Sequence, residues 1–141
     1  MEGESEVFGY GERGEDNRMR EIKFRAWFTI QKRMYSAYDF MNMSGFVHLL
    51  KNKTVIPMQF TGLLDKNGKK IFEGDIVEIY FPEPHIYEGQ IIKAIIEYEN
   101  GSFWYRGIDK KITDCNWHFY NMENFKVIGN IYENSDLLGE K

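Results

Sequence analysis

The sequence predicts a mainly β protein built around a small barrel, and two hairpin signals and one corner support this prediction. Asn67-Gly68 and Asn100-Gly101 each separate two apolar runs, and this dipeptide readily takes the positive φ values of the tight turns that match the twist of paired strands. Gly74 follows the first hairpin and can supply a conformation that other residues avoid. A small barrel needs such a corner to close.

The chain has the length and composition of one ordinary globular domain. It contains 141 residues, of which 43% are apolar and 28% are charged, and it has no apolar run long enough to span a membrane. The N-terminus lacks the basic and then apolar pattern of a signal peptide, and the single cysteine, Cys115, fits a reducing compartment. We therefore expect a cytoplasmic protein without an intramolecular disulfide.

Charge is distributed unevenly along the chain. Residues 1–18 hold six acidic side chains against two arginines, and their net charge of −4 equals that of the whole chain. Residues 19–141 therefore balance 16 acidic with 16 basic side chains. This balance offers no global field that would attract nucleic acid or an acidic membrane, so only local patches could bind them.

The pattern from residue 22 to residue 28 alternates with a period of two, as a strand does. Four apolar side chains share one face: Ile22, Phe24, Ala26 and Phe28. Lys23, Arg25 and Trp27 share the other face, and two cations beside an indole are typical of a contact to the backbone and bases of a nucleic acid. The alternative is that Trp27 packs under another element while the stems of Lys23 and Arg25 cover it.

The segment after this first strand predicts a series of short elements. Residues 31–33 are typical of a turn, and residues 34–38 of a second strand. Asp39 could cap one helical turn. The apolar run at residues 46–50 predicts a further short strand. Pro57 cannot donate a ladder hydrogen bond, so it marks either the first residue of the next strand or an edge.

Two hairpins and a final strand make up the predicted barrel. Residues 59–64 and 69–72 form the first hairpin, and residues 76–81 follow the corner, where Asp75 can hydrogen-bond the local backbone. The last strand covers residues 125–132.

The second hairpin has a self-consistent register around Asn100-Gly101. A two-residue loop pairs Glu99 with Ser102 and, further along, Ile96 with Tyr105. One side of the hairpin is then a predicted core face, made of Ile96, Tyr98, Phe103 and Tyr105. The other side presents Glu97, Glu99, Trp104 and Arg106.

Trp104 is the aromatic residue that this register leaves facing outward, between Glu97 and Arg106. Exposed tryptophans often belong to recognition surfaces, so these three residues, with the trio of the first strand, form the candidate interaction surface. The alternative is that the N-terminal segments or a second subunit of a homo-oligomer cover this face.

Reactive and metal-binding patterns are sparse in the sequence. Cys115 and His118 have the only spacing typical of metal ligands, but a structural zinc site needs four protein ligands and a catalytic one usually three. His48 and His85 have no partners at ligand spacing. No phosphate-binding loop, dinucleotide fingerprint or zinc-protease motif occurs. We therefore predict no metal, no cofactor and no catalytic residue.

Four segments carry a resemblance to a known family. They are residues 22–27 (IKFRAW), 58–77 (MQFTGLLDKNGKKIFEGDIV), 95–106 (IIEYENGSFWYR) and 127–134 (VIGNIYEN). In their order and spacing, the chain resembles the YopX family of phage and prophage proteins over nearly all of residues 19–138. The resemblance implies a mainly β protein with an SH3-like barrel, encoded by a temperate phage or its remnant. It supplies no catalytic or binding residues, and Phe28 departs from it, because family members often carry aspartate there.

Residues 1–18 lie outside this resemblance. The segment is acidic and rich in glycine with few apolar side chains, so it cannot offset the entropy of ordering and we expect it to be mobile. One interpretation is a translated leader before a native start at Met19, because residues 13–16 can be encoded by a purine-rich run that resembles a ribosome-binding site. The other is a genuine disordered tail.

We predict one domain at residues 19–138, in which an SH3-like barrel spans about residues 58–133 and residues 19–57 add strands to it. The signature segments contain turns and aromatic residues that build a barrel, and they contain few reactive groups. They favour a phage-encoded binding or adaptor module with a protein partner. A nucleic-acid-binding protein and an enzyme of unknown class are the two alternatives.

Overall fold

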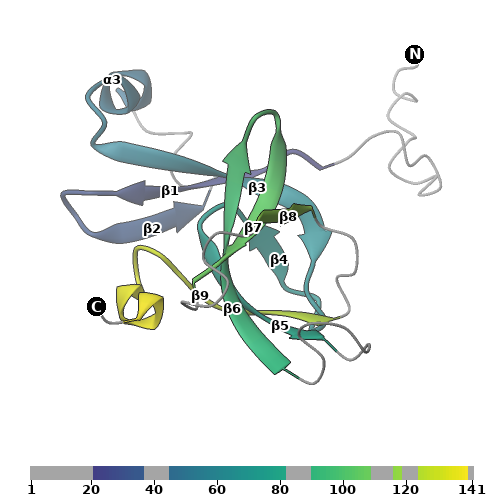
Figure 1. The fold of residues 1–141 in the computed structure, drawn as a ribbon. Helices are drawn as coiled ribbons and strands as arrows, with labels where there is room; N and C mark the ends of the chain where they lie inside the picture. The colour runs from purple at the N-terminus through teal and green to yellow at the C-terminus, as the bar shows by residue number, and fades with distance from the viewer. Residues whose placement is uncertain (1–20, 37–44, 82–89, 109–115, 119–123, 140–141) are drawn as a thin grey trace, which may run out of the picture.

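The computed structural model describes residues 21–36, 45–81, 90–108, 116–118 and 124–139, which form two antiparallel sheets with little helix (Figure 1). The first sheet has the strand order β2-β1-β3-β4, and the second has the order β8-β7-β6-β5-β9. The strands are β1 (Phe24–Phe28), β2 (Arg33–Ser36), β3 (Val55–Leu64), β4 (Lys70–Phe72), β5 (Asp75–Phe81), β6 (Gln90–Glu99), β7 (Ser102–Gly107), β8 (Asn116–His118) and β9 (Phe125–Asn130). Helix α3 (Phe46–Lys51) and the 3-10 helix η3 (Ser135–Leu138) complete the described elements.

The alternation along β1 buries its apolar face as the sequence predicts, but only in the second half of the strand. Ala26 and Phe28 are buried together with Val55 of β3, whereas Phe24 is partly exposed and Ile22 is largely exposed. Phe28 also packs against the ring of Tyr35, which lies on β2. This small cluster is the core of the first sheet.

Strand β3 connects the two ends of the first sheet, because its two halves pair with different neighbours. Residues 55–59 pair with β1, and β4 pairs with it from Phe60 onward. Pro57 is exposed and lies where β3 has, among the described strands, a neighbour on one side only. Of the two predicted places for Pro57, the first residue of the strand is wrong, because β3 begins at Val55, and the edge agrees with the described pairing, where a residue without an N–H is tolerated.

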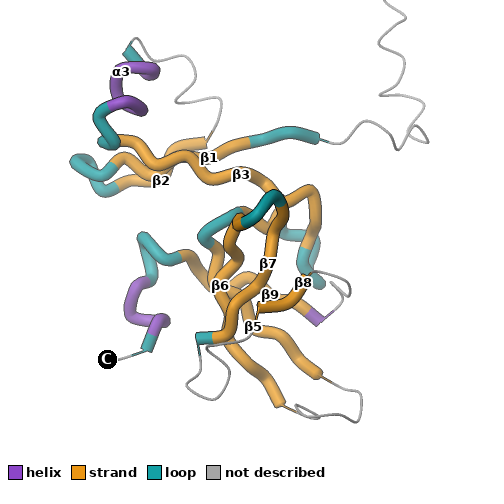
Figure 2. Tube along the Cα trace, turned by 45° about the horizontal axis from the view of Figure 1, so that its top comes forward, coloured by secondary structure: helices purple, strands orange, loops and turns teal. Residues whose placement is uncertain are grey.

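The second sheet curls around the main core (Figure 2). Nine buried residues form this core: Ile71, Val77, Ile79, Ile92, Ala94, Ile96, Tyr105, Phe125 and Val127. Ile71 comes from β4 of the first sheet, so the short strand β4 closes over the curled sheet. The chain is mainly β, as predicted.

The chain turns a corner at Gly74-Asp75, as the sequence predicts, and this corner joins the two sheets. Gly74 has a φ of 89°, and the Asp75 carboxylate accepts a hydrogen bond of 2.8 Å from the N–H of Phe72. The N–H of Gly74 donates to the carbonyl of Ile96, and its carbonyl accepts from the N–H of Ile131. The corner is therefore fixed to β6 and to the chain after β9.

The two hairpin turns differ from each other. Asn100 and Gly101 both have positive φ, and β6 pairs with β7 in the predicted register from Glu99 and Ser102 onward. The turn before β4 is longer than the predicted two-residue turn. Gly68 has a φ of 83°, but the φ of Asn67 is not positive. Asp65 sets this longer loop, because its Oδ1 accepts from two N–H groups of the loop, at 2.8 and 2.9 Å.

The predicted strand at residues 46–50 is wrong, because this run forms helix α3. Gly45 has a φ of 76°, and its carbonyl accepts the N–H of Leu49 in the first helical turn. Leu49 and Leu50 then pack against the core of the first sheet. A short apolar run does not distinguish strand from buried helix by periodicity, so contact with that core decides the outcome. The helical turn predicted after Asp39 lies outside the described residues.

No helix in the described part of the chain is long and apolar enough to cross a membrane.

Candidate functional site

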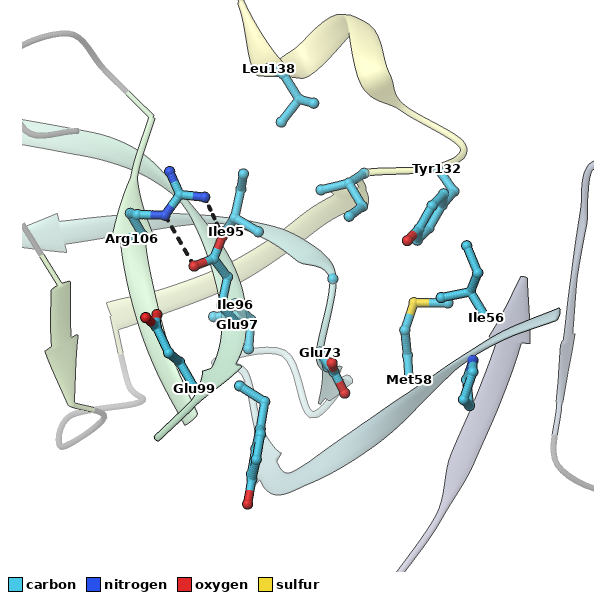
Figure 3. A pocket seen from close by; sticks show the side chains of 14 residues that line it. Ile56, Met58, Glu73, Ile95, Ile96, Glu97, Glu99, Arg106, Tyr132 and Leu138 are labelled. Atoms are coloured by element: carbon cyan, nitrogen blue, oxygen red, sulfur yellow. Dashed lines mark hydrogen bonds and ion pairs between the residues drawn. The ribbon is translucent and has the colours of Figure 1, made fainter. Parts of the chain in front are cut away.

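A cleft of about 410 Å³ lies between the two sheets and is the candidate functional site (Figure 3). It is lined by residues 56–58 of β3, residues 73 and 74 of the corner, residues 95–99 of β6, Arg106 of β7, and three residues after β9: Ile131, Tyr132 and Leu138. We call this hollow the inter-sheet cleft. Its position follows from the fold, because the corner turns the chain from one sheet into the other.

One side of the inter-sheet cleft is apolar and aromatic. Met58 is buried in β3, and Leu138, 37% exposed, projects from η3. The ring of Tyr132 stacks on Trp27 with centroids 5.5 Å apart and planes inclined by 17°. Figure 3 shows Met58 and Tyr132 on the same side of the cleft.

The opposite side carries an ion pair between Glu97 and Arg106. Arg106 donates from Nε to Glu97 Oε1 at 3.0 Å and from Nη2 to the second carboxylate oxygen. These residues are diagonal neighbours on paired strands, which brings their side chains within reach. The hydrogen bond to Glu97 raises the pKa of the Arg106 guanidinium, so this cation stays charged.

Carboxylates outnumber cations in the lining of the cleft. Among the described residues that line the cleft, Glu73, Glu97 and Glu99 face a single arginine, Arg106. The Oε1 of Glu73 accepts a 3.1 Å hydrogen bond from the backbone N–H of Gln59, which is a neutral donor. Burial raises the pKa of the Tyr132 hydroxyl, and the negative charge of Glu73 raises it further. The cleft therefore favours positive charge.

The comparisons with known proteins agree with this fold. The family model described as YopX protein matches residues 41–139, which is more than half of the chain. The chain belongs to the YopX family. It is also similar to the crystal structure of protein EF1440 from Enterococcus faecalis, with 27% identity and a TM-score of 0.53. That similarity covers 86% of this chain and 100% of the other. No curated protein matches the sequence.

Arg25 of this YopX protein does not form an exposed contact surface. Its Nη2 lies 2.8 Å from Asp75 Oδ1, and the two side chains are 15% and 2% exposed. The same Nη2 donates to the carbonyl of Glu73 at 3.2 Å, and the guanidinium lies 4.7 Å from the ring centroid of Phe72. The face of β1 that carries Arg25 packs on the corner, so this residue ties the first sheet to the second.

The ionisation of Asp75 follows from this burial. Burial raises the pKa of the Asp75 carboxyl, and the Arg25 guanidinium and the N–H of Phe72 act against that rise. The Nε of Arg25 is buried and has no hydrogen-bond partner among the described residues. The guanidinium of Arg25 thus pairs with Asp75, and neither residue lines the cleft.

The other predicted surface residues have different positions. Glu97 and Arg106 line the cleft. Trp27 does not line it but stacks on Tyr132, which does. Trp104 is half-buried, and its Nε1 donates to the carbonyl of Glu99 at 3.1 Å. Lys23 is half-buried, and its carbonyl accepts the N–H of Phe60. Lys23 and Trp104 do not belong to the lining of the cleft.

Sequence reasoning missed Tyr132 and misplaced Tyr98. Tyr98 was predicted to be a core residue, but it is 51% exposed, packs edge-on against Phe103 and lines the cleft. The register is correct, but the buried core ends at Ile96 and Tyr105. Tyr132 has one sequence signal: Asn130 precedes it, and the Asn130 side chain accepts the N–H of Tyr132 in a local turn.

Within the described ranges, no group of three or more His, Cys, Asp or Glu side chains is placed to hold a metal ion. Cys115 and His85 lie outside those ranges.

Proposed function

We propose that this YopX protein is a non-catalytic binding module encoded by a phage or prophage, and that it acts in the cytoplasm of the bacterial host. The observation that carries the proposal is the inter-sheet cleft, where an apolar and aromatic side faces a side of fixed charges. Binding sites typically combine a hydrophobic lining with a few placed polar groups. A segment of a partner protein would lie in this cleft.

The proposal includes an SH3-like barrel over about residues 58–133, made of β3 from residue 58 onward, β4 and the curled second sheet, with β1 and β2 as additional strands. The curvature of the second sheet and the position of Ile71 of β4 in its core support this description. The rigid sheets would then hold the cleft residues in place, which reduces the entropy lost on binding.

Nucleic-acid binding is less well supported by the cleft than protein binding. A phosphate backbone is attracted by uncompensated lysines and arginines, whereas Arg25 pairs with Asp75 and Arg106 pairs with Glu97. The carboxylates of the cleft would repel phosphates.

Affinity capture from host lysate with matched variants tests the proposal. Leu138→Asn removes an apolar side chain of the cleft, and Leu64→Asn makes the same change at an exposed strand position outside it. We expect the parent and Leu64→Asn to capture the same protein, with and without nuclease, and Leu138→Asn to lose it. A capture that nuclease abolishes would favour the nucleic-acid alternative. A capture that Leu138→Asn leaves intact would contradict the role of the cleft.

A further inference from the structure

We propose that the inter-sheet cleft recognises a basic segment of a partner protein, in which a lysine or arginine follows or precedes an apolar side chain. This inference rests on the proposed function and specifies the chemistry of the partner. It is carried by the excess of carboxylates in a cleft whose remaining surface is apolar and aromatic.

The charges of the cleft are not all compensated within it. Both carboxylate oxygens of Glu97 accept from Arg106, so this pair contributes little net charge. Glu99 is exposed at the end of β6, and Glu73 accepts from a backbone N–H. Figure 3 shows Glu73 between the apolar side and the side that carries Glu97 and Glu99. A cationic side chain entering here would meet the carboxylates of Glu73 and Glu99.

The aromatic residues suit the same ligand. Tyr132 is held by its stack on Trp27, and its ring borders the cleft. Tyrosine rings attract a lysine or arginine placed over their faces. Met58, Ile95 and Leu138 offer apolar contacts for a neighbouring side chain of the ligand. Because the cleft combines carboxylates, an aromatic ring and apolar side chains, it should bind a segment that is both basic and apolar more tightly than a purely apolar segment.

Charge also argues against two other occupants. Residues 1–18 of this chain carry a net charge of −4, so the cleft would repel them. A nucleic acid would be repelled for the same reason.

Selection from a library of random linear peptides displayed on phage tests the inference. We expect the enriched peptides to contain lysine or arginine beside an apolar residue. The strongest of them, synthesised with a fluorescent label, is then titrated with the parent and with variants by fluorescence anisotropy. Glu99→Lys should weaken its binding roughly tenfold, equivalent to about 1.4 kcal/mol, because it replaces attraction by repulsion. Glu21→Lys, the same charge change at an exposed site outside the cleft, should leave the Kd unchanged.

The variants separate failure of this inference from failure of the proposed function. Enriched peptides that are neutral or acidic, and whose binding is lost in Leu138→Asn but unchanged in Glu99→Lys, would overturn the basic ligand and leave the cleft as a binding site. A library that gives no binder, or only binders insensitive to both variants, would overturn both. A dimer of the chain that Glu99→Lys dissociates would place a second copy in the cleft and contradict the inference.

Discussion

Removing the cation of the Arg25–Asp75 ion pair should be among the most destabilising single changes in the described part of this protein. Asp75 is 2% exposed and its carboxylate lies 2.8 Å from Arg25. Arg25→Met keeps part of the apolar stem but removes the guanidinium that lies over the Phe72 ring, and it leaves the Asp75 charge buried without its cation. Breaking a buried pair in this way costs about 3 to 5 kcal/mol of unfolding free energy. We therefore expect a loss in this range at neutral pH.

The loss should depend on pH in a defined direction. The pKa of Asp75 in the folded protein is raised above its ordinary value of 3.8 by burial, and Arg25 opposes that rise. The stability contributed by Asp75 is therefore fully present below pH 3.8 and is lost as the pH rises through its folded pKa. Arg25→Met raises that folded pKa further. The difference between parent and variant should thus shrink toward acidic pH, where Asp75 is protonated in both.

Urea unfolding at neutral and acidic pH measures both effects, with Arg33→Met as the control. Arg33 is exposed and lies over the ring of Tyr35, so its loss should cost less than about 1 kcal/mol. Combining Arg25→Met with Asp75→Asn removes the buried charge and should recover part of the loss. The reasoning is refuted if Arg25→Met is no more destabilising than Arg33→Met, or if its effect is the same at both pH values.

Three further changes test the fold. Asp65→Ala should lower the free energy of unfolding by at least about 2 kcal/mol, because three backbone N–H groups lose a charged acceptor. Burial raises the pKa of Asp65, but these hydrogen bonds outweigh it and hold the pKa below 3.8, so urea unfolding should show the Asp65 contribution to stability above that pH and its loss below it. Gly74→Ala should lower the melting temperature more than Gly101→Ala does. Both glycines have positive φ, but a Cβ at residue 74 would lie 3.0 Å from the sulfur of Met58, whereas a Cβ at residue 101 would meet open space. Tyr105→Ala should cost about 3 to 5 kcal/mol, and half-buried Trp104→Ala clearly less; equal denaturation midpoints would contradict the assigned core.

Local chemistry made parts of this fold predictable from the sequence. Asn100-Gly101 fixes a two-residue turn, and the register of β6 and β7 follows from it by counting. The Gly74-Asp75 corner likewise depends on the positive φ of Gly74 and on one hydrogen bond between residues three positions apart in the sequence. Both features involve residues that are close together in the chain.

Features that depend on distant residues were not predictable in this way. Periodicity placed Arg25 opposite the apolar face of β1, but only the fold brings it to Asp75. The same holds for the cleft, because Tyr132 and Glu73 come from segments that meet when the corner closes. The exposure of Tyr98 depends on where along β6 the buried core ends. The register between β6 and β7 tells which face a residue is on, but it does not tell where the core ends.

Photo-crosslinking in host cells would test most directly whether the inter-sheet cleft is a binding site for a protein. A photoreactive benzoylphenylalanine replaces Tyr98, which lines the cleft and is 51% exposed, or Tyr80, which is 45% exposed and lies outside it. Both substitutions replace one exposed aromatic ring by another, so folding should be affected equally. We predict a discrete protein adduct from position 98 and none from position 80. An adduct from position 80 alone, or a nucleic acid crosslinked at position 98, would contradict the account.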